Sequence, residues 1–162
     1  MSGRFHQLGY VTNSLAQARQ VFAQTMNVTC FRQRERRPAT RLRGAAGEAS
    51  LLVAVANVAG AQIEIIEPIA GQIDVFRDAL ARDGFVLSFH HIAYRFEGGL
   101  KDWRRHLAAL QASGRPIAWQ SAPSEEGEFA YTDDRSRLGH YVEHLWSTDA
   151  RWRQALEGIP YN

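Results

Sequence analysis

The stretch His6-Gln7-Leu8-Gly9-Tyr10-Val11 is followed 84 residues later by a similar hexad, His90-His91-Ile92-Ala93-Tyr94-Arg95. After each hexad comes an apolar stretch with a carboxylate at its centre: Gln62-Ile63-Glu64-Ile65-Ile66 and Tyr141-Val142-Glu143-His144-Leu145. The two central glutamates are 79 residues apart, so both pairs of segments repeat at nearly the same offset. Segments that recur in order at a near-constant offset indicate a duplicated module. The chain is therefore expected to contain two related halves.

Both halves show the same order of strand and helix patterns. In the first half the patterns predict a strand at residues 5–12, a helix with its N-cap at Asn13 or Ser14, and strands at residues 28–34, 50–57 and 61–67. In the second half they predict a strand at residues 88–96, a helix at residues 100–112, and strands at residues 116–121, 128–132 and 139–146. Each half is therefore a β-α-β-β-β unit.

These units divide the chain into four parts. Residues 1–68 form the first module, 69–87 a connector with a short helix, 88–147 the second module, and 148–162 a tail expected to pack as a short helix. A sheet with one covering helix leaves its other face bare, so the two sheets must share faces or enclose a cavity. The expected fold class is α+β, with two tandem βαβββ modules forming a curved mixed sheet around a central cavity.

Composition narrows the classes of protein. The chain of 162 residues is 45% hydrophobic and 22% charged, which is typical of a globular protein. No apolar run approaches the roughly 20 residues of a membrane span, and the N-terminus has no signal-peptide stretch. The single cysteine, Cys30, excludes a cysteine-rich zinc site and an intramolecular disulfide. A cytoplasmic protein without a membrane partner is expected.

The net charge is only +2, but one segment is strongly basic. Six arginines crowd it: Arg32, Arg34, Arg36, Arg37, Arg41 and Arg43. Arginine suits phosphate and carboxylate recognition, so binding of an anionic substrate tail is one interpretation. A solvated loop or hairpin is the other, and runs of charge more often form a solvated surface. No nucleic-acid motif accompanies these residues, so no nucleic-acid partner is expected.

The repeat also brings possible metal ligands into register. Strand alternation places Gln7 on the face opposite to His6, and His91 on the face opposite to His90. On the last strand, His140 and His144 share the face opposite Glu143. Imidazole and carboxylate groups bind first-row divalent metals well, and an amide oxygen binds them more weakly.

Glu64 and Glu143 lie within apolar runs, where an unpaired carboxylate is costly to bury. Metal ligation, pairing with Arg95, or an exposed strand face would each account for them. Gln7 is either a ligand or a hydrogen-bonding surface residue. Tyr131 and Tyr141 are candidates for lining a substrate pocket, with ordinary packing as the alternative.

The two hexads, with Gln62 to Pro68 and Gly139 to Leu145, resemble the vicinal oxygen chelate superfamily of glyoxalases, bleomycin-resistance proteins and extradiol dioxygenases. The resemblance extends from Phe5 to Leu145. In that superfamily a metal ligand directly precedes a hydrophobic–small–hydrophobic triplet on the first strand of each module. The resemblance thus implies a divalent metal (zinc, nickel, cobalt, manganese or magnesium) held by Gln7, Glu64, His91 and Glu143.

The motifs share features with more than one class of enzyme in the superfamily. The ligand set is similar to that of eukaryotic-type glyoxalase I, but Val11 and Pro68 stand where that enzyme has polar glutathione-binding residues. The run from Ile63 to Pro68 is more similar in sequence to methylmalonyl-CoA epimerases, which usually carry glutamine at the position of Glu64. Extradiol dioxygenases use two histidines and one carboxylate, so Gln7 argues against that class.

The expected function is that of a metal-dependent isomerase or lyase acting on a small substrate, anionic or CoA-linked. The metal would chelate the substrate, and Glu143 or Glu64 would remove a proton next to its carbonyl. Arg95, Tyr131 and Tyr141 are the expected substrate-binding residues. The alternative is a metal-free small-molecule binding protein like the bleomycin-resistance proteins. Superfamily members commonly pair modules across dimers, so a homodimer is expected.

Overall fold

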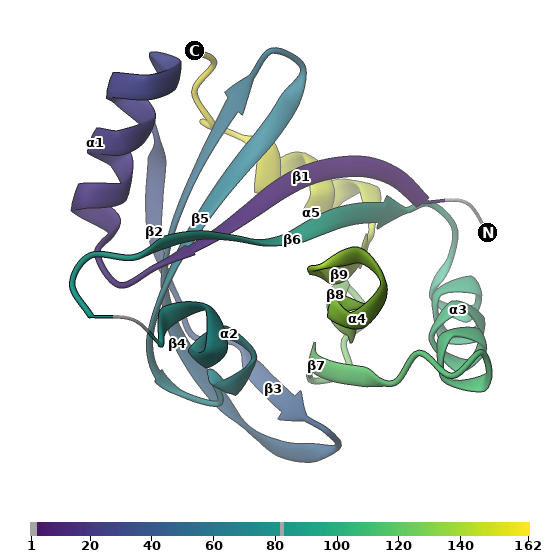
Figure 1. Ribbon diagram of the computed structural model, residues 1–162. Coiled ribbons are helices and arrows are strands. Elements are labelled where there is room, and N and C mark those ends of the chain that lie inside the picture. Colours follow the sequence, from purple (N-terminus) through teal and green to yellow (C-terminus); the bar gives the residue numbers. More distant parts are fainter. Residues whose placement is uncertain (1–2, 82) are drawn as a thin grey trace.

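The computed structural model describes residues 3–81 and 83–162, which form nine strands and five helices (Figure 1). The first half contains β1 (Gly3–Thr12), α1 (Leu15–Met26), β2 (Arg32–Arg36), β3 (Ala39–Leu42), β4 (Ala45–Val58) and β5 (Ala61–Gly71). The short helix α2 (Asp74–Leu80) leads to the second half. That half contains β6 (Leu87–Phe96), α3 (Leu100–Ala112), β7 (Ile117–Ser121), β8 (Gly127–Asp133), α4 (Arg135–Leu138) and β9 (Tyr141–Ser147), and α5 (Asp149–Leu156) follows.

The strands form one curved mixed sheet in the order β2-β4-β3-β7-β8-β9-β6-β1-β5. An additional pairing joins the last strand of this order, β5, to the second, β4, so the strands from β4 to β5 close into a ring around an interior. Strand β2 pairs with β4 alongside this ring. The expected α+β class with a curved mixed sheet is confirmed.

Two parallel strand pairs relate the halves. Strand β1 runs parallel to β5, and Gln7 lies beside Gln62 and Gly9 beside Glu64. Strand β6 runs parallel to β9, with His91 beside Tyr141 and Ala93 beside Glu143. The two registers are the same, so Gln7 is the counterpart of His91, and Glu64 is the counterpart of Glu143. The antiparallel pair β1–β6 joins the two halves.

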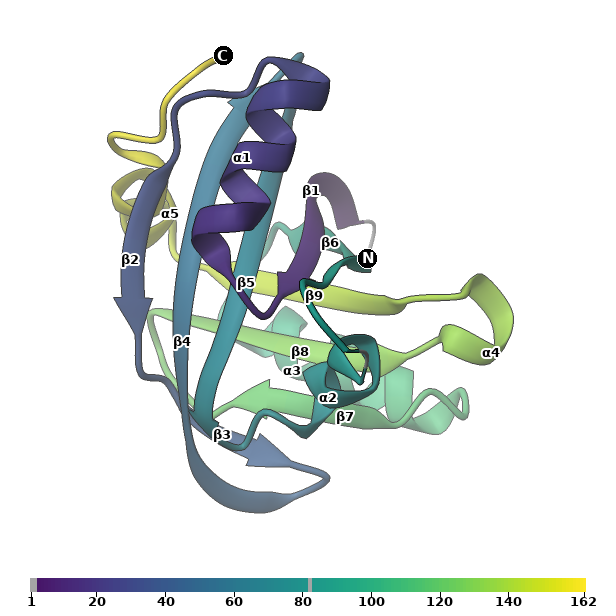
Figure 2. The same ribbon diagram turned by 60° about the vertical axis from the view of Figure 1, so that its left-hand side comes forward.

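The helices α1 and α3 cover outer faces of the sheet. The Ser14 hydroxyl accepts a hydrogen bond from the Gln17 backbone and caps α1, as the sequence indicated. Figure 2 shows α1 lying along β4 and β5, where the buried ring of Phe22 joins a cluster that contains Ala54 and Ile65. In the second half α3 spans residues 100–112, the predicted range, and buries Trp103.

The main departure from the predicted elements is the arginine-rich segment. The strand predicted at residues 28–34 begins only at Arg32. Of the expected loop or hairpin, the structure shows the hairpin, because β3 pairs antiparallel with the start of β4. Strand β4 is 14 residues long. Its residues 45–48 pair with β3, and its residues 51–55 pair with β2. Pairing with β4 thus stabilises β2 and β3 as strands, although the segment is rich in arginine. No helix in the described residues is long and apolar enough to cross a membrane.

Candidate metal centre

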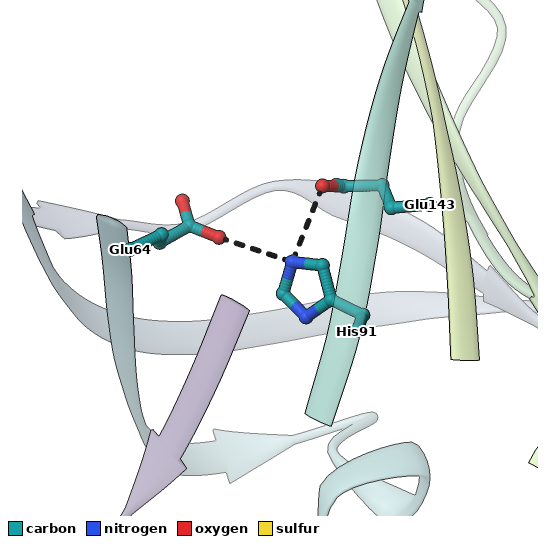
Figure 3. A group of neighbouring side chains, drawn as sticks. All are labelled: Glu64, His91 and Glu143. Atoms are coloured by element: carbon teal, nitrogen blue, oxygen red, sulfur yellow. Dashed lines mark ion pairs between the residues drawn. The ribbon is translucent and has the colours of Figure 1, made fainter. Parts of the chain in front are cut away.

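Three side chains from three strands meet inside the sheet: Glu64 from β5, His91 from β6 and Glu143 from β9 (Figure 3). The His91 Nε2 atom lies 3.5 Å from a Glu64 carboxylate oxygen and 3.4 Å from a Glu143 oxygen. The three candidate ligand atoms all lie within 4.8 Å of one another. The structure thus brings together three of the four residues expected to bind a metal.

These separations suit a divalent ion. Two ligands held about 2.1 Å from one metal lie about 3.0 Å apart at a right angle and about 3.4 Å apart at the tetrahedral angle. One imidazole and two carboxylates are also a common donor set for first-row divalent metals. The residues therefore fit the group that the resemblance implies.

His91 is completely buried, and its charge is set by the two glutamates. Burial alone would lower the pKa of His91, but its hydrogen bonds to Glu143 and Glu64 outweigh burial and raise the pKa to about 9. Without a metal, His91 is thus an imidazolium at neutral pH, and its positive charge compensates the two carboxylates.

Glu143 and Tyr131 complete this polar group. Burial raises the pKa of Glu143, and the adjacent His91 offsets part of the increase. The Tyr131 hydroxyl lies 3.4 Å from His91 Nε2. Burial, with the charges of both glutamates, raises the pKa of Tyr131, so its hydroxyl stays protonated. Tyr131 is therefore a neutral hydrogen-bond donor beside two acidic groups.

Gly9 makes room for the His91 ring. The two residues lie opposite each other on the antiparallel strands β1 and β6. A Cβ atom on Gly9 would overlap the imidazole, because its three nearest neighbours are all ring atoms of His91. Only glycine at this position lets the ring lie against the β1 backbone.

Gln7 lies next to the three central residues but has its own partner. It is buried, and its Nε2 atom donates to the Gln62 side chain at 3.2 Å. An amide binds metals through its oxygen, which this hydrogen bond does not use. The structure thus places Gln7 on the wall of the same cavity as Glu64 and Glu143.

The face predicted for His6 is wrong. The β1–β6 pairing contains an irregularity between Phe5 and Gln7, so His6 is an extra residue in the ladder. A bulge interrupts the alternation of side chains, and His6 lines the cavity together with Gln7. Burial lowers the pKa of His6 to about 4. A bulge leaves no clear sequence signal here, so strand alternation missed this residue.

The central residues open into a cavity of about 460 Å³. Glu64 and Glu143 line it, and His91 lies fully buried beside them. Leu51 and Trp119 contribute apolar surface, and α5 adds further lining residues, among them Trp152. The sequence predicted α5 only as a packed tail, so its contribution to the cavity was missed.

The strongest charge in the cavity lining comes from the segment around β2. Three arginines at alternate positions of β2 line the cavity: Arg32, Arg34 and Arg36. Arg37, which follows β2, and Arg151 from α5 also line it. Arg32 and Arg34 both donate to the Ala155 carbonyl near the end of α5. Arg37 pairs with Glu35. The expected basic segment thus faces the same space as the metal-binding candidates.

The three expected substrate-binding residues lie in different places. Tyr131 lines the cavity. Arg95 instead pairs with Asp149 at 3.1 Å and lies over the Trp152 ring. Tyr141 lines a second pocket of about 200 Å³ with His90 and Arg135. The structure therefore brings one of the three to the cavity.

The remaining histidines separate into two groups. His144 lies under α3, where its Nδ1 is 3.0 Å from His106 Nε2, and the His140 Nδ1 donates to the Tyr141 carbonyl. Neither reaches the cavity lining, as expected. His90 was expected to face away from His91, yet the Nδ1 atoms of the two rings are 3.1 Å apart. The β1–β6 pairing has a second irregularity here, because His90 falls between the pairs Gly9–His91 and Tyr10–Phe89. Such a bulge interrupts the alternation of side chains, and the His90 ring contacts the Val75 carbonyl of α2.

Replacing Gly9 tests the space under His91. Gly9→Ala should displace the imidazole and lower zinc affinity at least tenfold, measured by competition with a chromophoric chelator. Gly99→Ala is the matched control, because a Cβ there meets nothing closer than 4.0 Å. Equal zinc affinity in the two variants would contradict the role of Gly9.

The charge of His91 gives a second prediction. A metal that binds Nε2 must displace a proton at any pH below about 9. Zinc affinity should therefore rise about tenfold per pH unit between pH 6.5 and 8, with release of about one proton. Calorimetry in buffers of different ionisation enthalpy measures this release. Affinity that stays constant over the window would be the opposite result.

Comparison with known proteins places this site in a family. A family model described as "Glyoxalase/Bleomycin resistance protein/Dioxygenase superfamily" matches residues 6–132. A search of curated proteins finds no match.

Several solved structures share the fold at low sequence identity. A methylmalonyl-CoA epimerase in complex with methylmalonyl-CoA and NH4+ is 14% identical, with a TM-score of 0.56, and the match covers 92% of this chain and 97% of that one. A variant of the Streptomyces coelicolor epimerase with 2-nitronate-propionyl-CoA is 13% identical, with a TM-score of 0.56 and coverages of 92% and 97%. The Mycobacterium tuberculosis epimerase is 14% identical, with a TM-score of 0.51 and coverages of 93% and 91%. These likenesses show the fold. By its family match, the chain belongs to the glyoxalase/bleomycin resistance protein/dioxygenase superfamily.

Proposed function

We propose that this protein is a metal-dependent isomerase or lyase that removes a proton next to the carbonyl of a small substrate. One observation carries the proposal: Glu64, His91 and Glu143 place three ligand atoms within 4.8 Å at the edge of a cavity. Metal ligands that also face a substrate-sized space are the usual arrangement of a catalytic metal site, which keeps positions for water or substrate.

Glu64, His91, Glu143 and, through its oxygen, Gln7 would hold the ion. A bound zinc, nickel, cobalt, manganese or magnesium ion would polarise the substrate carbonyl and stabilise the negative charge that forms when the neighbouring proton leaves. The neutral Tyr131 hydroxyl is aimed at the same place and would donate a hydrogen bond to a developing oxyanion.

The proton would be carried by a glutamate. Burial raises the pKa of Glu143, which makes its carboxylate a stronger base than an exposed one. Glu64 is the second carboxylate at the site and comes from a different strand, β5. Two carboxylates next to one substrate carbon would allow one to remove a proton and the other to return it, as an isomerase requires.

The arginines around β2 define the polarity of the substrate. Five arginines line the cavity, and an anionic group is the ligand that they would bind best. Structural neighbours are bound to CoA thioesters, which carry phosphates at one end and a carbonyl at the other. An acyl-CoA is therefore the first substrate class to test, followed by small 2-hydroxy-carbonyl compounds.

The second candidate function is sequestration of a small molecule without a metal. Trp119 and Trp152 line the cavity with the arginines, and such a lining would bind an aromatic or anionic compound. In this case ligand binding would change tryptophan fluorescence and would not respond to a chelator.

The two functions can be separated with one pair of proteins. Protein purified without chelator should hold about one divalent ion and exchange deuterium into the carbon next to an acyl-CoA carbonyl, measured by mass spectrometry. His91→Ala should lose the ion and at least 100-fold of the exchange rate. His140→Ala, which leaves the cavity intact, should retain both. Full exchange in the presence of a chelator would refute the metal-dependent mechanism.

The arginines give a further prediction. Arg36→Ala should raise the KM for an anionic substrate about fivefold, the effect of one partly exposed charge contact, with little change in kcat. Arg41→Ala is the matched control, because Arg41 belongs to the same basic segment but not to the cavity lining. An equal rise of KM in both variants would contradict the prediction, because it would show a response to the overall positive charge of the segment and not to a contact with Arg36 in the cavity.

A further inference from the structure

The inference concerns His90, which the proposed reaction does not use. Its ring is buried and lies between aromatic side chains, with centroid distances of 4.8 Å to Tyr141 and 5.0 Å to Phe76. Both ring nitrogens have partners. Nε2 lies 3.0 Å from the Val75 carbonyl oxygen, and Nδ1 lies 3.1 Å from His91 Nδ1.

These partners determine which nitrogen of His90 carries its proton. A carbonyl oxygen only accepts hydrogen bonds, so the Nε2 atom that contacts Val75 must carry a hydrogen. A neutral imidazole has one donor and one acceptor nitrogen, and the Nδ1 atom of a neutral His90 is therefore an acceptor. A second cation 3.1 Å from the His91 ring would be unfavourable in a buried, aromatic surrounding.

The protons of His91 follow from those of His90. If His90 Nδ1 accepts, His91 Nδ1 must donate to it. The other nitrogen, His91 Nε2, is then the one that faces the Glu64 and Glu143 carboxylates. The tautomer of a metal-binding histidine is commonly fixed by the hydrogen bond that its second nitrogen makes.

We propose that His90 is a positioning residue: through the chain from the Val75 carbonyl to His90 and on to His91 Nδ1, it fixes the orientation and tautomer of His91, so that Nε2 points at Glu64 and Glu143. This inference rests on the proposed function, because positioning His91 matters for a residue that binds a metal. The contacts of His90 themselves do not depend on a metal. It also gives α2 a role, because that helix supplies the Val75 carbonyl.

The first test observes the protons directly and needs no metal. Nitrogen-15 NMR of histidine-labelled, metal-free protein at pH 7 should show His90 as a neutral ring with its hydrogen on Nε2, and the signal is assigned by its loss in His90→Phe. A His90 ring protonated on Nδ1 would overturn the proposal.

The second test measures zinc affinity. His90→Phe keeps an aromatic ring but removes both nitrogens, and should weaken zinc binding roughly tenfold to a hundredfold. His90→Asn restores an acceptor near the position of Nδ1 and should recover part of the loss. His140→Phe is the matched control, because His140 lines the same small pocket as His90 but bonds to the Tyr141 carbonyl and not to His91.

The outcomes separate the two proposals. Wild-type zinc affinity in His90→Phe, or an equal loss in His90→Phe and His90→Asn, would refute the positioning role, because packing alone would then explain any effect. If the wild-type protein binds no divalent ion, the proposed function fails, while the NMR experiment still decides the role of His90.

Discussion

Two carboxylates placed against one buried imidazole are the constraint on which the centre of this molecule depends. The side chains of Glu64 and Glu143 are only 17% and 8% exposed, and His91 is completely buried between them. Leaving a buried charge without its partner typically costs about 3–5 kcal/mol. The group therefore needs a positive charge at its centre at all times. The His91 imidazolium supplies it in the metal-free protein, and a divalent ion would supply it in the proposed metal-bound form. A proton and a metal thus compete for the same place, which makes the site suited to reversible metal binding.

The sheet provides this arrangement through strand register. Glu64 and Glu143 come from β5 and β9, which are separated in the sheet by β1 and β6. Each glutamate is fixed by parallel pairing with its own inner strand, and the antiparallel β1–β6 pair sets the distance between the two halves. A shift of one residue in that central pair would turn the side chains to the other face. The duplicated sequence is thus the simplest route to a site in which two equivalent carboxylates approach one point.

The sequence alone predicted much of this, and the failures have physical causes. The repeat indicated two related halves and four candidate ligands, three of which meet in the centre. Helical periodicity gave the exact range of α3. Alternation failed at His6, where a bulge adds a residue to the strand. It failed again at His90, where a second irregularity in the β1–β6 pairing accompanies the contact between the His90 and His91 rings. Arg95 was assigned to substrate, but α5 supplies Asp149 and Trp152 as its partners. A local sequence pattern does not predict the contacts that α5 makes with strands far from it in the sequence.

The two halves differ at the positions that face each other across the central strand pair. On the central strand pair His91 lies opposite Gly9, and Gln7 lies opposite Ala93. The His91 ring occupies the space that a side chain at position 9 would fill. Gln7 has no ring, and Ala93 opposite it carries a Cβ atom. The Gln7 amide instead donates to the Gln62 side chain on β5. The glycine on β1 thus accompanies the imidazole on β6, and the two halves share a strand register but differ in the space that each leaves beside its first strand.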